Sequence, residues 1–424
     1  MSIRKQGTLN LLKQRSDLTF KHNTNKSRHG WIRLTPAYSL KIVNEILESQ
    51  DKKQRVFDPF SGTSTTVLCA VMKGHAGYGM DINPFLVWLG GVKLASYNQS
   101  VLSECVESAE QIVGLIRTGK VEAIEPPNLF NIKRWWNQEH LGFLCQVKAG
   151  IEELYPANCA NCLAKDLLYI AFCRTLINLS NASFNHQSMS FKKVVKEQTH
   201  LIPLETTTRE SDIRAFRDDL SFVIKGALAN PRSTGKIILG DSRNVDKYFS
   251  EKFDLVITSP PYPNRMSYIR ELRPYMYWLG HLNQPREAGE LDWKSIGGTW
   301  GIATSRLNNW SKDEHSYCPD YLIEVIESVK KSDTKSGEIL ANYIGKYFED
   351  IWYHLNSVKR VMEPGGEVHY IIGNSKFYDV IVPSEIVFGD MMEKIGFESC
   401  SIKQIRKRNS KKELSEFDVH AIAG

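Results

Sequence analysis

The sequence contains no uninterrupted apolar run of the length that a helix needs to cross a bilayer. Its first residues, MSIRKQGTLNLLKQRSDLTF, also lack the continuous apolar segment of a secretory signal. No internal repeat and no low-complexity tract is present. We therefore expect a cytoplasmic protein with no membrane partner.

Paired cysteine motifs are also scarce. Among eight cysteines only Cys159 and Cys162 form a CxxC pair, and no second pair stands at zinc-ribbon spacing. A structural zinc ion needs four ligands, so one pair supplies half of a site. We predict reduced thiols and no metal site, with a zinc-binding CxxC as the less favoured alternative.

Charge of one sign does not dominate either. The net charge is +6 over 424 residues, which permits a polyanionic partner without requiring one. The length is enough for two or three domains, or for one large domain with insertions. Short apolar strands alternate with helical patterns, which predicts an α/β fold with helices on both faces of a sheet.

The strongest of these α/β units runs from Gln54 to Pro84. A short apolar strand is followed by the tight turn DPFSGTS, a helix, a second strand and Asp81 at its end. This order is typical of nucleotide-binding units, but GxGxxG is absent and Asp58 heads the turn. A carboxylate there disfavours a pyrophosphate. A cationic ligand with a ribose, such as S-adenosylmethionine, fits better.

Two further strand ends carry polar residues. GDS follows the strand at 236–239, where Asp241 can accept a hydrogen bond from an adenine amino group. The apolar strand 253–257 leads into Thr258 and then Ser259-Pro260-Pro261-Tyr262. Because two prolines forbid helix and ladder, this segment leaves the strand stiffly extended. It offers a hydroxyl, carbonyls and an aromatic ring, which suit a flat base with an exocyclic amine. A proline-rich turn with a core tyrosine is the alternative.

The ordered motifs DPFSGTST, GMDINP, GDS, FDLVITSPPY and EPGGEVHYIIGNS resemble those of S-adenosylmethionine-dependent DNA amino-methyltransferases. The resemblance covers about 31–100 and 236–424. It implies a Rossmann-like class I methyltransferase sheet with helices on both faces and mostly helical insertions. It further implies that Ser259, Pro260, Pro261 and Tyr262 are catalytic. The cofactor-binding residues that it implies are Asp58, Pro59, Phe60, Gly62, Thr63, Ser64, Asp81, Ile82, Asp241 and Ser242.

Within that family the SPPY form resembles cytosine-N4 enzymes, because Asp or Asn in place of Ser259 is typical of adenine-N6 enzymes. Cytosine-C5 enzymes carry a nucleophilic cysteine where this chain has Tyr262, so transfer to an exocyclic nitrogen is favoured. Adenine-N6 methylation remains an alternative. An RNA amino-methyltransferase or a non-catalytic DNA-binding subunit remains a second one. Ser64 departs from the family pattern, in which a glycine is common.

The resemblance also organises the remaining chain. We expect an N-terminal arm (1–30), a cofactor-binding half (31–105), a helical insertion that carries target recognition (106–232), a catalytic part (233–280), a second insertion that contacts DNA (281–335) and the rest of the methyltransferase sheet (336–424). Polar and basic loops in these segments supply candidate DNA contacts: Arg265, Asn185, Gln187, Lys192, Arg406 and Arg408.

The partners follow from the same resemblance. Double-stranded DNA is the expected substrate, bound by a monomer at the nucleoid, and a cognate restriction endonuclease is the expected genetic rather than physical partner. Both insertions are candidates for target recognition, and 106–232 is favoured because it is the larger.

Overall fold

The computed structural model describes residues 15–35, 37–156, 162–183, 190–192, 204–299, 302–408 and 413–424. Its centre is a seven-stranded sheet in the order β10-β11-β7-β6-β1-β2-β5. The strands β5, β2, β1, β6 and β7 run parallel, and β11 pairs antiparallel with both β7 and β10. The seven strands are β1 (Arg55–Asp58), β2 (Ala76–Asp81), β5 (Gly235–Leu239), β6 (Phe253–Thr258), β7 (Met362–Gly373), β10 (Phe397–Lys407) and β11 (Ser415–Ala423).

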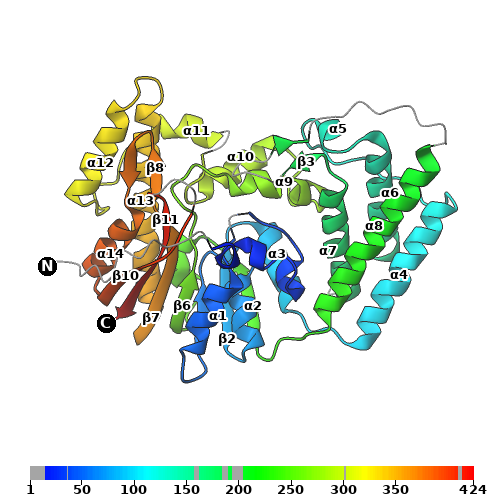
Figure 1. Ribbon diagram of the computed structural model, residues 1–424, viewed down its shortest axis with the longest axis horizontal. Helices are drawn as coiled ribbons and strands as arrows, with labels where there is room; N and C mark the ends of the chain where they lie inside the picture. Colours follow the sequence, from blue (N-terminus) through cyan, green and yellow to red (C-terminus); the bar gives the residue numbers. More distant parts are fainter. Residues whose placement is uncertain are drawn as a thin grey trace.

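Helices cover both faces of this sheet, as the alternation of strands and helices predicted (Figure 1). On one face, α1 (Leu40–Glu48) and α2 (Thr65–Met72) pack on apolar residues of β1, β6 and β7. On the other face lie η4 (Ser242–Lys247), α13 (Gly337–Arg360) and α14 (Ser384–Ile395). Residues that alternate along each strand supply the two cores, because successive side chains point to opposite faces. The result is a Rossmann-like α/β fold.

A third core belongs to a group of helices beside the sheet, at the right of Figure 1. Long helices of the central part of the chain stand together there and share one continuous set of buried apolar residues. The helices of this core are α3 (Pro84–Leu94), α4 (Gln99–Arg117), α5 (Ile132–Trp135), α6 (Gln138–Leu154), α7 (Leu163–Asn178), α8 (Leu204–Ala227) and α9 (Tyr268–Trp278).

Shorter elements complete the described chain. Three 3-10 helices precede α1: η1 (Ser16–Leu18), η2 (Phe20–His22) and η3 (Ser27–Gly30). Two small antiparallel pairs are β3 (Ala182–Ser183) with β4 (Ser190–Phe191), and β8 (Ser375–Phe377) with β9 (Val380–Val382). Between α9 and α13 lie α10 (Pro285–Lys294), α11 (Ile302–Leu307) and α12 (Asp320–Lys331). Among the described residues, no helix combines the length and the apolar character that a membrane crossing requires.

Two helix boundaries differ from the sequence prediction. Thr35-Pro36 in the sequence is typical of an N-cap and a first helical residue, but α1 begins at Leu40, where the Ser39 side chain accepts a hydrogen bond from the backbone N–H of Lys41. Thr35 instead donates its own N–H and hydroxyl to Glu271 at 2.9 and 2.7 Å. The single helix expected over 85–105 is two helices, because Asn98 caps a new helix through the N–H of Val101.

The predicted N-terminal arm packs into the fold through a buried side chain. Arg28 is fully buried and donates hydrogen bonds to the carbonyls of Lys93, Ala95 and Ala227 at 2.7, 2.5 and 3.0 Å. One guanidinium therefore satisfies backbone acceptors at the ends of two helices that lie far apart in sequence. It ties the arm to the junction between the sheet and the helical group.

Candidate active site

A cleft opens where β1, β2, β5 and β6 end at their carboxyl ends, which is where open parallel sheets bind ligands. Apolar walls come from Leu34, Leu86 and Ile296. Residues expected at the site from the sequence form much of the lining: Pro59, Phe60, Gly62, Thr63, Asp81, Ile82, Asp241, Ser242, Ser259 and Pro261. Four others expected there, Asp58, Ser64, Pro260 and Tyr262, lie outside the lining.

Asp58 lies behind the lining rather than in it. Its side chain is fully buried, and its Oδ1 accepts hydrogen bonds from the Thr258 hydroxyl at 2.6 Å and from the N–H of Phe60 at 3.1 Å. Burial raises the pKa of the Asp58 carboxyl to about 6, and the nearby Asp81 adds to the shift. The carboxylate therefore connects the turn after β1 to β6. It would attract a cationic ligand by its negative charge, without direct contact.

Asp81 is the carboxylate that faces the cleft. Its Oδ2 accepts from the N–H of Gly62 at 2.8 Å and its Oδ1 from the N–H of Asn83 at 2.9 Å. Burial raises the pKa of Asp81 to about 6 despite these bonds. Each oxygen keeps a lone pair for a further donor. The side chain thus joins the Gly-turn to the second strand and still offers acceptors to a ligand hydroxyl.

The turn between β1 and α2 adopts left-handed backbone at two positions. Gly62 has φ +50°, and the buried Ser64 has φ +64°. Such backbone is strained for any residue with a Cβ. Lys93 lies fully buried beneath the turn and donates to the carbonyl of Thr63 at 2.7 Å. Burial lowers the pKa of this ammonium to about 7. The Lys93 side chain of α3 therefore stabilises the strained turn by a hydrogen bond to its backbone.

Asp241 differs from the other two acids because it is already paired. Arg243 donates to its Oδ1 at 2.9 Å and to its Oδ2 at 2.6 Å, and it also reaches Asp350 at 2.7 Å. Burial by itself would raise the pKa of Asp241, but the guanidinium outweighs it and lowers the pKa. An adenine amino group would thus share this carboxylate with Arg243. Sequence reasoning missed Arg243, although its spacing of two residues from Asp241 was a usable signal.

The segment Ser259–Tyr262 is held by residues distant in the sequence. The Pro261 carbonyl accepts from the Tyr347 hydroxyl at 2.8 Å, and the Tyr262 hydroxyl donates to Glu416 at 2.9 Å. The guanidinium of Arg408 lies 4.9 Å from the centre of the Tyr262 ring, within cation–π range. Tyr347 and Glu416 were missed, and no local pattern indicated either of them.

Four of the six DNA-contact candidates lie within the described residues: Arg265, Lys192, Arg406 and Arg408. Arg265 is exposed in the loop after the catalytic segment, with φ +58°, and Lys192 donates to the Ser180 carbonyl at 3.1 Å. Asn185 and Gln187 lie outside the described residues, as do Lys411, Lys412 and Cys159.

Arg406 and Arg408, two of the predicted DNA contacts, form contacts within the protein. Arg406 forms an ion pair with the buried Glu416 at 2.8 Å. Arg408 donates to the Asn374 carbonyl at 2.7 Å while it covers Tyr262. Both side chains turn toward the catalytic segment because a buried carboxylate and an aromatic face compensate their charge there.

The donor set of the cleft fits S-adenosylmethionine. Asp81 offers carboxylate oxygens to ribose hydroxyls, apolar walls suit an adenine ring, and two buried carboxylates suit a cationic ligand. The left-handed Gly62 lets the backbone approach the ligand closely.

Comparisons with known proteins agree with this chemistry. No protein-family model matches the chain. The Type II methyltransferase M.BsoBI of Geobacillus stearothermophilus is 20% identical over 94% of this chain and 85% of its own length. The Type II methyltransferase M.MvaI of Kocuria varians is 22% identical over 88% and 82%, and M.AvaI of Nostoc sp. is 21% identical over 94% and 86%. Motif order, sheet topology and this similarity along most of each chain relate the protein to Type II methyltransferases, and the donor set of the cleft fits S-adenosylmethionine as the methyl donor.

Proposed function

We propose that this protein transfers a methyl group to the N4 amino group of cytosine in double-stranded DNA, as the modification enzyme of a restriction–modification system. The observation that carries the proposal is the position of Ser259. Ser259 lines the cleft directly after the end of β6, and its hydroxyl lies 3.5 Å from the Tyr262 hydroxyl. The similarity to Type II methyltransferases supports the restriction–modification context.

The cofactor would bind in the part of the cleft formed by the turn after β1 and by the ends of β2 and β5. Asp81 would accept hydrogen bonds from ribose hydroxyls, and Gly62 would lie against the methionine part, with Asp58 contributing negative charge from behind. Asp241 and Ser242 would flank the adenine. S-adenosylmethionine, when bound, supplies an electrophilic methyl group on its sulfonium sulfur.

The catalytic part orients the target amine. A cytosine rotated out of the duplex would stack on Tyr262, at a cost of a few kcal/mol for leaving the helix. Ser259 Oγ and the Pro260 carbonyl would accept its N–H groups and direct the nitrogen lone pair toward the methyl donor. A serine hydroxyl is a weak base, so orientation contributes more than proton removal.

Arg408 bears directly on this step. Because its guanidinium covers one face of the Tyr262 ring at 4.9 Å, an incoming base must use the opposite face or displace the arginine. Displacement would free Arg408 to contact the DNA backbone, and its hydrogen bond to the Asn374 carbonyl is the contact that it would give up. Arg408 thus remains a proposed DNA contact, together with Arg265 and Lys192.

Target recognition is proposed for the helical group of α4–α8, which overlaps the predicted insertion 106–232. The segment with α10, α11 and α12 is the second candidate, since it follows α9, the first helix after Ser259–Tyr262. We further propose that the protein acts as a monomer. Gel filtration at micromolar concentration, without and with a DNA duplex, tests this.

The test of the function is long-read detection of modified bases in DNA from a methylation-free host that expresses the full chain. We expect N4-methylcytosine at one short sequence motif, and none with the matched variant Ser259→Ala. N6-methyladenine at that motif would overturn the cytosine assignment. Methyl transfer in vitro to single-stranded RNA but not to duplex DNA would overturn the DNA substrate.

A further inference from the structure

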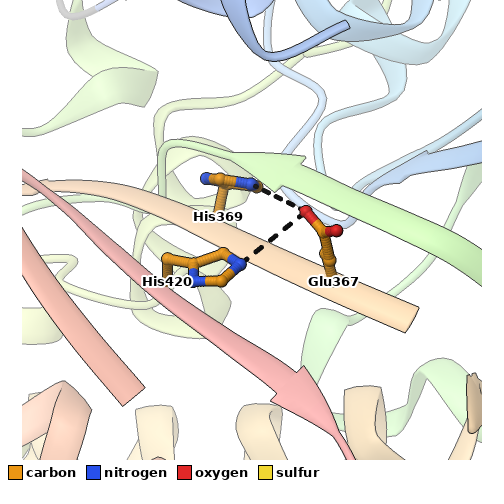
Figure 2. Close-up of side chains that lie close together, drawn as sticks. All are labelled: Glu367, His369 and His420. Carbon is orange, nitrogen blue, oxygen red and sulfur yellow. Dashed lines mark ion pairs between the residues drawn. The ribbon is translucent and has the colours of Figure 1, made fainter. Parts of the chain in front are cut away.

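A compact group of potential metal ligands lies on one face of the β7–β11 pair, outside the cleft (Figure 2). Glu367 and His369 stand two residues apart on β7, so their side chains share a face of the sheet. His420 on β11 is the direct antiparallel partner of His369. The three side chains therefore come from two adjacent strands and converge because of strand register, which no local sequence pattern reveals.

The three ligand atoms lie near one another but are too far apart for direct hydrogen bonds. Glu367 Oε2 lies 3.6 Å from His369 Nε2 and 3.7 Å from His420 Nε2, and all three atoms lie within 4.8 Å of one another. These separations are longer than direct hydrogen bonds. They leave a point about 2 Å from each atom, which is the usual length of a bond from zinc to imidazole nitrogen or carboxylate oxygen.

A second layer of contacts orients His369 for this role. Asp418 accepts from its Nδ1 at 3.0 Å, so the Nε2 atom faces Glu367. Carboxylate–histidine pairs of this kind fix the tautomer of metal-binding imidazoles. Ser401 Oγ stands 3.5 Å from Nδ1 of His420. Both imidazoles thus present Nε2 to the same carboxylate oxygen.

Charge and access also favour a cation. Two carboxylates, those of Glu367 and Asp418, lie beside the two imidazoles on this face. The side chains of His369, His420 and Glu367 keep 13%, 24% and 40% of their surface exposed. An ion can therefore enter from solvent and keep a water as its fourth ligand.

We propose that Glu367, His369 and His420 bind a divalent transition-metal ion, with zinc as the best match to two imidazoles and one carboxylate. Magnesium and calcium prefer ligand sets made of oxygen alone. The ion would connect β7 to β11. Strand β11 also carries Glu416, which accepts a hydrogen bond from the Tyr262 hydroxyl. The site is structural and takes no part in methyl transfer.

The experiment uses the tag-free full chain, stripped with a chelator and titrated with zinc chloride by calorimetry and with cobalt chloride by absorption. We expect one ion per chain, a cobalt spectrum of imidazole and carboxylate ligation, and a higher thermal unfolding midpoint with zinc. His420→Gln should weaken zinc binding at least 100-fold. Asp418→Asn should weaken it about tenfold, the range found for outer-shell partners.

Matched controls separate this site from other histidines and from the cysteine pair. His315→Gln, at an exposed position, and the double variant Cys159→Ser/Cys162→Ser should both bind zinc as the unaltered protein does. No stoichiometric binding by the intact chain overturns the proposal. So does binding that survives in His369→Gln/His420→Gln, or binding that is lost in the cysteine variant. If a histidine variant does not fold, the cobalt spectrum of the intact protein decides.

Discussion

The two turns that follow the neighbouring strands β1 and β6 are stabilised in different ways. The turn after β1 is held by two contacts that are near in sequence and by one that is remote. Asp81 binds Gly62 over 19 positions and Lys93 reaches Thr63 over 30, while Thr258 binds Asp58 over 200. The turn after β6 is held by remote residues, with Tyr347 on Pro261 over 86 positions and Glu416 on Tyr262 over 154.

The difference separates two tasks. The first turn needs buried negative charge and close backbone approach, which a short motif can carry. The second turn needs an aromatic ring fixed in space, and a stiff proline pair alone does not fix it. Hydroxyl and carboxylate partners from α13 and β11 supply that restraint. Substitutions in the first turn should therefore change cofactor affinity, and substitutions around the second should change turnover.

The largest effect is expected from Asp81→Asn. Loss of a charged acceptor for the ribose costs about 1.5–3 kcal/mol, or roughly 10–100-fold in cofactor dissociation constant. Titration calorimetry with S-adenosylmethionine measures it. Asp51→Asn, at an exposed position, is the matched control and should bind normally. An unchanged dissociation constant in Asp81→Asn would remove Asp81 from the cofactor site.

A pH series probes the same turn. Burial raises the pKa values of Asp58 and Asp81 to about 6, so both carboxyls are largely neutral at pH 5 and ionised at pH 7.5. Cofactor affinity should rise about tenfold across this interval, because ionisation of one such group changes roughly tenfold per pH unit below its pKa. In Asp81→Asn this rise should be smaller.

The ligand-free protein should show the opposite trend in stability. A pKa raised by folding contributes stability that is complete below the usual carboxyl pKa and is lost as the pH rises through about 6. Urea unfolding without cofactor should detect this loss between pH 4 and pH 7. A flat profile in both cofactor affinity and stability would contradict the raised pKa values.

Glu416→Ala tests the second turn. Removal of the acceptor of the Tyr262 hydroxyl, worth about 1 kcal/mol, should lower kcat roughly fivefold and leave the cofactor KM unchanged. Tyr262→Phe should give a similar loss, and the double variant should lose little more than either one. Glu416→Gln, which keeps an acceptor, should restore most of kcat. Additive losses would show that Glu416 acts elsewhere.

The smallest effect is expected at Ser64. Its φ of +64° is costly for a residue with a Cβ, so Ser64→Gly should be about 0.5–1 kcal/mol more stable than Ser64→Ala, which keeps the strain. Equilibrium urea unfolding of the two variants gives the comparison. Equal stabilities would mean that the turn relaxes around the side chain.

Much of the fold followed from the sequence. The strands that end at Asp58, Asp81 and Thr258 carry apolar runs of strand length, and the prediction of an α/β sheet covered on both faces is confirmed. The predicted start of the first helix was wrong, because Thr35 binds the remote Glu271 and Ser39 caps α1 instead. The contacts of Arg406 with Glu416 and of Arg408 with Tyr262 were not predicted either. Strand pairing and packing between distant segments bring these residues together.

What the sequence determined by itself was the set of local units: the Gly-turn, the acids at strand ends and the stiff Ser259–Tyr262 segment. Each depends on backbone preferences and periodicities that span a few residues. Only the tertiary structure decided which acid faces the cleft, which is paired with arginine, what fixes Tyr262 and that two histidines meet one glutamate. These depend on register and packing between segments up to 200 residues apart, and a linear sequence does not carry that distance information.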